Sequence, residues 1–149
     1  MKKTYFLIRV LIIYLFFISS GFAAKSNYFD KGKILFDKKN FEKSKIFFEK
    51  DIVFNPQSEK SYLYLAKIFN ETDNGMEEEI NLSNVLLLNP RNDEAIYMLT
   101  LLKIKQSDYN EAKELIKKFN LVCEFFCSKR TEIHEKFDKL LPENARDNN

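Results

Sequence analysis

Apolar residues recur with helical spacing along most of the chain, and short polar segments interrupt them at regular intervals. Steps of three and four residues bring these apolar side chains onto one face of a helix. The pattern predicts six helices, at residues 27–37, 41–54, 59–71, 75–88, 93–105 and 109–121. Taken in pairs they form three hairpins, and the chain is predicted to be all-α.

A seventh amphipathic helix is predicted at residues 128–141. Its apolar residues recur at i, i+4, i+7 and i+8, and its other face is charged. The apolar residues are Ile133, Phe137, Leu140 and Leu141. A helical array needs a terminal element with a polar outer side, so we interpret this segment as a capping helix. The polar residues 142–149 are predicted to be a disordered tail.

The hairpins repeat with a fixed period. Asn55-Pro56 and Asn89-Pro90 each follow a helical pattern and lie 34 residues apart. A proline at this place stops a helix, because it disfavours helical geometry in the residue before it. Residues 40–44 (NFEKS) and 108–112 (DYNEA) open a helix in the same way and lie 68 residues apart, twice that period. These agreements indicate an internal repeat.

The repeated segments resemble the tetratricopeptide repeat, a helix–turn–helix unit of about 34 residues. The third unit is the most similar, with DEAIYMLT at residues 93–100 and QSDYNEA at residues 106–112. The resemblance covers residues 25–124, as units at about 25–58, 59–92 and 93–126, and it implies an α-solenoid of three hairpins. Three residues depart from the family pattern: Gly75 replaces an aromatic, Glu78 a small residue and Lys103 an apolar one.

The N-terminal residues are predicted to be an export signal rather than part of the repeats. Lys2 and Lys3 precede the apolar run Val10–Ile18, and small residues follow up to Ala24, as in a secretory signal peptide. We expect a hydrophobic signal helix within residues 1–23, cleavage after Ala23, and a periplasmic or secreted protein. The alternative is an uncleaved anchor that holds the protein at the membrane, facing the periplasm. Arg9 leaves only 15 residues up to Ala24, fewer than the roughly 20 that a spanning helix needs.

Charge argues against a nucleic-acid partner. The chain has 24 basic and 22 acidic residues, and the signal segment holds three of the basic ones and none of the acidic ones. The rest of the chain therefore carries 21 basic and 22 acidic residues, interspersed without a basic stripe. Nucleic-acid binding surfaces concentrate positive charge, so we expect no nucleic-acid partner.

The sequence offers little for catalysis or for metal binding. The single histidine, His134, has no Cys, His or Asp set at ligand spacing around it, and no nucleophile elbow or glycine-rich phosphate loop occurs. The acidic run Glu77–Glu79 suits the first turn of a helix, where negative charge is favourable. We expect neither enzyme activity nor a metal or cofactor.

Cys123 and Cys127 are the only cysteines. An even number in an exported protein suggests a disulfide, yet residues at i and i+4 on a helix lie about 6 Å apart at Cα, near the upper limit for a bridge. The pair lies where the third hairpin gives way to the capping helix, so a bent backbone would bring the two closer. Two buried thiols are the main alternative, and a redox or metal role is a further one.

The resemblance implies a scaffold that binds a protein partner. Repeats of this family line a concave groove with the first helix of each hairpin, so we expect a peptide or helix of an envelope protein to bind there. The predicted groove residues are Phe29, Lys33, Phe36, Lys60, Leu63, Lys67, Asn70, Tyr97, Leu101 and Ile104. Such a mixed surface suits a segment with apolar anchors and a few acidic residues.

Three alternatives limit this interpretation. The family's clamp for acidic C-terminal peptides is absent, because Phe29, Tyr64 and Met98 occupy three of its positions. The groove residues of the third unit are equally compatible with burial between helices or with contact to a second copy. The alternative function is a self-associating or membrane-tethered structural subunit of an envelope complex, although a monomer is favoured.

Overall fold

The computed structural model describes residues 27–140, which form helices and no strands. The helices are α2 (Tyr28–Asp37), α3 (Phe41–Phe54), α4 (Glu59–Glu71), α5 (Gly75–Leu88), α6 (Asp93–Lys105), α7 (Tyr109–Val122) and α8 (Arg130–Leu140). A 3-10 turn, η1 (Cys127–Lys129), precedes α8. The six helices predicted for the hairpins are confirmed, each end to within one residue. The predicted signal segment and the C-terminal tail lie outside the described residues.

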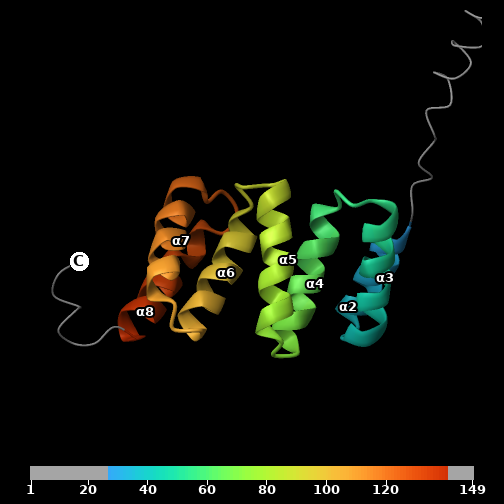
Figure 1. Cartoon of the computed structure of the whole chain (residues 1–149), viewed down its shortest axis with the longest axis horizontal. Coiled ribbons are helices and arrows are strands. Elements are labelled where there is room, and N and C mark those ends of the chain that lie inside the picture. Colours follow the sequence, from blue (N-terminus) through green and yellow to red (C-terminus); the bar gives the residue numbers. More distant parts are fainter. Residues whose placement is uncertain (1–26, 141–149) are drawn as a thin grey trace, which may run out of the picture.

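The hairpins stand side by side along one axis, as Figure 1 shows from blue to red. The hairpins are α2–α3, α4–α5 and α6–α7, and α8 packs on both α6 and α7 at the far end. Each hairpin packs against the next through its neighbouring helices, α3 on α4 and α5 on α6. This nearest-neighbour packing is that of an α-solenoid.

The tight turn inside each hairpin has the same geometry in all three units. Lys39, Asp73 and Ser107, spaced 34 residues apart, adopt left-handed backbone conformations with φ of 56°, 57° and 63°. The next residue in each unit caps the following helix through its side chain: Asn40, Asn74 and Asp108 accept hydrogen bonds from the backbone N–H three residues on, at 3.2–3.3 Å. Each cap supplies a partner for an N–H that the helix leaves unpaired, which offsets the cost of the left-handed turn residue.

Small residues let the two helices of the first hairpin approach closely. Gly32 of α2 is buried against the ring of Phe48 in α3, and Ser44 Oγ donates to the Gly32 carbonyl at 2.8 Å. The residues 34 and 68 positions after Gly32, Ala66 and Thr100, are fully buried as well. The sequence repeat is therefore a repeat of close helix crossings.

The buried apolar residues form two clusters rather than one. The first cluster lies between α3 and α4 and contains Phe48, Leu65, Ile68 and Phe69. The second runs through the remaining hairpins to α8 and includes residues such as Leu82, Ile96, Phe119 and Ile133. Helix α4 contributes to both, since Leu63 and Ala66 belong to the second cluster.

A buried carboxylate holds the chain where it leaves each of the last two hairpins. Glu59, the first residue of α4, accepts hydrogen bonds from Asn89 Nδ2 at 3.0 Å and Asn92 Nδ2 at 2.5 Å, beyond α5. Asp93 is its counterpart 34 residues later, and its Oδ2 accepts the N–H groups of Glu124, Phe125 and Phe126 at 2.6–2.7 Å. Although burial acts to raise the pKa of Asp93, these backbone donors hold it below its ordinary value.

The same loop contains a disulfide. Cys123 and Cys127 are bonded, with Cα atoms 5.2 Å apart, after α7 has ended at Val122. The chain is bent here rather than helical, which brings the two residues closer than the roughly 6 Å expected on one helix. The loop is thus fixed twice, by its own covalent bond and by the carboxylate of Asp93.

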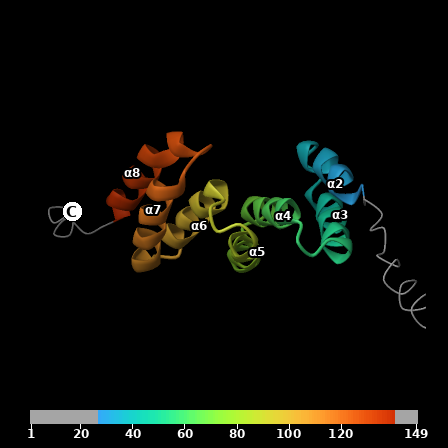
Figure 2. The same ribbon diagram turned by 90° about the horizontal axis from the view of Figure 1, so that it is seen from above.

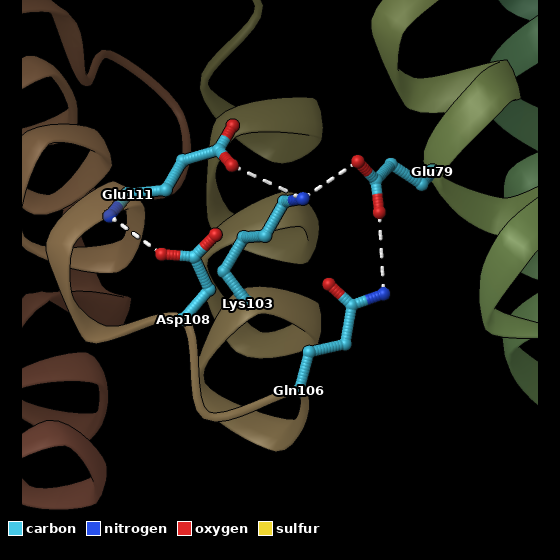
Figure 3. Close-up of polar contacts among 5 residues, drawn as sticks. All are labelled: Glu79, Lys103, Gln106, Asp108 and Glu111. Carbon is cyan, nitrogen blue, oxygen red and sulfur yellow. Dashed lines mark hydrogen bonds and ion pairs between the residues drawn. The ribbon is translucent and has the colours of Figure 1, made fainter.

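Lys103 ties three helices together at the far side of the third unit (Figure 3). Its ammonium group lies 2.6 Å from Glu79 Oε1 of α5 and 3.1 Å from Glu111 Oε2 of α7, and Gln106 also donates to Glu79. Burial alone would lower the pKa of Lys103, but the hydrogen bonds to the two carboxylates hold it above its ordinary value. The lysine at this expected apolar position is therefore charged and paired.

Replacing Gly32 with alanine tests the close crossing in the first hairpin. A Cβ atom there would lie 2.7 Å from Phe48 Cε1, so we expect Gly32→Ala to lower the free energy of unfolding by about 1–3 kcal/mol, measured by thermal or urea denaturation. Gly75→Ala is the matched control. Its Cβ would come no nearer than 3.3 Å to an atom of Leu102, and we expect a change below about 1 kcal/mol. Equal effects of the two substitutions would contradict the packing account.

Candidate functional site

A pocket of about 310 Å³ opens where the first helices of the three hairpins face one another. Its lining comes from α2, α4 and α6: Phe36, Lys67, Asn70, Glu71, Glu94, Tyr97, Met98 and Leu101. Five of the ten predicted groove residues meet here, namely Phe36, Lys67, Asn70, Tyr97 and Leu101. All eight lining side chains are at least partly exposed, so they are accessible to a partner.

The other predicted groove residues do not line this pocket. Phe29 packs between the rings of Phe48 and Tyr64, with centroids 5.7 and 5.5 Å away, whereas Lys33 and Lys60 are exposed. Leu63 and Ile104 are buried, with 8% and 5% of their surface exposed, which corrects their assignment to an open surface. The stripe was drawn for isolated helices, but neighbouring helices cover both sides of α4 and α6.

An ion pair joins the walls of the pocket. Lys67 Nζ of α4 lies 2.8 Å from Glu94 Oε1 of α6, and each side chain is about a quarter exposed. The same ammonium group lies 4.8 Å above the ring of Tyr64, whose edge meets Phe36 with ring centroids 5.1 Å apart. The pocket thus has an apolar wall on α2 and a charged one across α4 and α6.

Tyr97 connects the pocket to the capping helix. Its hydroxyl donates to Glu132 Oε1 at 2.9 Å, and Glu132 also pairs with Lys129 at 2.8 Å and Lys136 at 2.9 Å. Burial and this acceptor raise the pKa of Tyr97 to about 12. The hydrogen bonds from Lys129, Lys136 and Tyr97 lower the pKa of Glu132 to about 2. The half-buried ring is held further by Phe126, whose centroid lies 5.9 Å away.

A second hollow, of about 370 Å³, lies between α6 and α8. It is lined by Leu101, Ile104, Lys105, Lys136 and Lys139. Leu101 lines both hollows, so the two are neighbours on one surface. Sequence reasoning missed the lysines, because the position of α8 relative to α6 cannot be read from helical periodicity.

No group of His, Cys, Asp and Glu side chains within residues 27–140 is arranged to hold a metal ion. His134 lies in a separate hollow between α7 and α8, with its Nε2 3.3 Å from Asn120 Nδ2. In the same range, no helix has the length and apolar character that crossing a membrane requires.

The Glu132 network makes stability depend on pH. Because the pKa of Glu132 falls from an ordinary 4.5 to about 2, its contribution to stability is complete above pH 4.5 and is lost as the pH falls through about 2. We expect Glu132→Gln to lower the melting temperature by about 4 °C at pH 7 and to have little effect near pH 2. Glu135→Gln, on the exposed side of α8, is the control and should be neutral at both. A constant difference across pH would argue against the network.

Comparison with family models finds no match, and neither does a comparison with curated proteins. Solved structures do match. A structure from work on Pseudomonas aeruginosa PilF aligns with a TM-score of 0.64 and 17% identity over 80% of this chain. A chain of a CopN–Scc3 complex aligns with a TM-score of 0.65 and 17% identity, over 81% of this chain and 72% of that one. The match spans only about half, 53%, of the PilF chain. These neighbours are tetratricopeptide-type proteins, and the similarity supports a tetratricopeptide-like helical repeat fold.

Proposed function

We propose that this chain is an exported interaction module that binds a peptide or helix of an envelope protein in the pocket between α2, α4 and α6. The observation that carries this proposal is the convergence of side chains from all three hairpins on one partly exposed pocket. A site that needs every unit of a repeat array is expected of a scaffold, whose extended concave face is its binding surface.

The composition of the pocket suits a peptide. Phe36, Tyr97, Met98 and Leu101 provide apolar surface for an anchor side chain. The polar side chains around them can fix the direction of the bound backbone. An apolar centre with a polar rim is the usual anatomy of a protein interface.

Two further observations support the proposal. One structural neighbour is a chain of a protein complex, CopN–Scc3, which favours a protein partner for this fold. The bond between Cys123 and Cys127 suits an oxidising compartment outside the cytosol, and so agrees with the predicted export signal.

Capture of the native partner tests the proposal. We expect Met98→Ser with Leu101→Ser to reduce crosslinking of the partner in the intact envelope by about tenfold, because both side chains line the pocket. The matched control is Met76→Ser with Leu87→Ser, which removes two equally apolar side chains from an exposed face of α5 and should leave capture unchanged.

Folding is checked by circular dichroism and thermal melting. If the double substitution in the pocket unfolds the chain, Glu71→Arg replaces it, since Glu71 is exposed and lines the pocket. Capture that persists with Glu71→Arg, or that falls equally with the α5 control, would overturn the proposed pocket.

A structural role is the second candidate. Met76, Ile80 and Leu87 form an apolar stripe on one face of α5, with 75%, 49% and 80% of their surface exposed. Exposed apolar stripes of this kind mark contacts with other molecules, a second copy among them. A stable oligomer in sedimentation that Leu87→Glu dissociates would favour this role, whereas a monomer favours the binding module.

A further inference from the structure

The hollow between α6 and α8 has an apolar floor and a basic rim. Leu101 and Ile104 form the floor, and Lys105, Lys136 and Lys139 form the rim. No acidic side chain lines it. An apolar floor surrounded by ammonium groups fits an apolar side chain that has carboxylates close to it in sequence.

The surroundings of this hollow are positively charged on balance. Lys105 pairs with Asp73, and Lys136 shares Glu132 with Lys129. With Lys139 on the rim, four lysines face two carboxylates. Glu132 also accepts the hydroxyl of Tyr97, so its charge is divided among three donors. A partner carboxylate placed here gains attraction to several ammonium groups at once.

The neighbouring pocket carries the opposite charge. Among its lining residues, Lys67 is the only basic one, and it stands against Glu71 and Glu94. The groove is therefore acidic near α4 and basic near α8, and Leu101 lies between the two halves. This polarity gives a bound segment a preferred direction.

We propose that the occupant of this groove is an acidic segment of a protein, with an aliphatic or aromatic anchor above Leu101 and Ile104 and carboxylates on the side of α8. The inference rests on the proposed function and specifies its partner. The anchor follows from the apolar floor, which a free inorganic anion would leave uncovered. The carboxylates follow from Lys105, Lys136 and Lys139, which come from the end of α6 and from α8. The positions of the family's clamp, at Phe29, Tyr64 and Met98, supply none of these lysines.

Synthetic peptides test this inference directly. Three fluorescein-labelled peptides share one length and one pair of leucine anchors, and differ only in flanks of glutamate, serine or lysine. Binding to the purified protein is measured by fluorescence anisotropy at low and at moderate salt. We expect the glutamate peptide to bind about tenfold more tightly than the serine peptide, and its advantage to shrink as salt rises. The lysine peptide is expected to bind most weakly.

Neutral substitutions locate the effect. We expect Lys136→Gln with Lys139→Gln to abolish the advantage of the glutamate peptide, while Lys43→Gln with Lys50→Gln leaves it within about twofold. Lys43 and Lys50 lie on the exposed surface of α3, so the control removes the same charge elsewhere. In the unsubstituted protein, methyl resonances of Leu101 and Ile104 are expected to shift when the glutamate peptide binds. This readout does not depend on any variant being folded.

The outcomes separate the two proposals. Equal binding of all three peptides would overturn the acidic preference and leave the binding module standing. Binding of the glutamate peptide that Lys136→Gln with Lys139→Gln does not weaken would place it elsewhere and overturn the inference. If no peptide binds, the inference also fails, and capture of the native partner then decides the proposed function separately.

Discussion

The carboxylate of Asp93 is the interaction on which the end of the array depends. It lies at the start of α6 and accepts three consecutive backbone N–H groups from the loop beyond α7. Without it, those donors would lose a charged acceptor, and a buried donor left unpaired costs about 1–3 kcal/mol. Because this loop leads into α8, the position of the capping helix, of Glu132 and of the basic rim all follow from one ionised side chain.

Polar residues inside this array are tolerated because each has a partner in another helix or turn. Glu78, at a position that the repeat pattern reserves for a small residue, is buried, and its Oε1 accepts Asn70 Nδ2 at 3.0 Å. Burial raises its pKa, so the amide supplies part of what water would have given. Lys103 is accommodated by two carboxylates in the same way. Departures from the repeat pattern thus became cross-links between elements, which agrees with the rule that buried polar groups persist when satisfied.

Helix ends were predictable because they are set by local chemistry. The prolines after α3 and α5 and the capping residues Asn40 and Asp108 act within a few positions of themselves. The left-handed turn residues were not foreseen, since Lys39, Asp73 and Ser107 have side chains that give no such signal. The placement of α8 was beyond periodicity as well. It depends on contacts between residues more than 30 positions apart, such as Asp93 with the loop after α7 and Tyr97 with Glu132.

Sharing α4 between two clusters gives the array an uneven stiffness. The first hairpin is joined to the rest largely through aromatic rings, with Tyr64 of α4 meeting Phe29, Phe36 and Phe48. Figure 2 shows this hairpin standing off from the row that runs from α4 to α8. Ring contacts are non-directional and slide more readily than a network of charged hydrogen bonds. The hairpin that carries Phe36 can therefore tilt about α4 as an arm, widening or narrowing the groove around segments of different girth while the block around Asp93 keeps its shape.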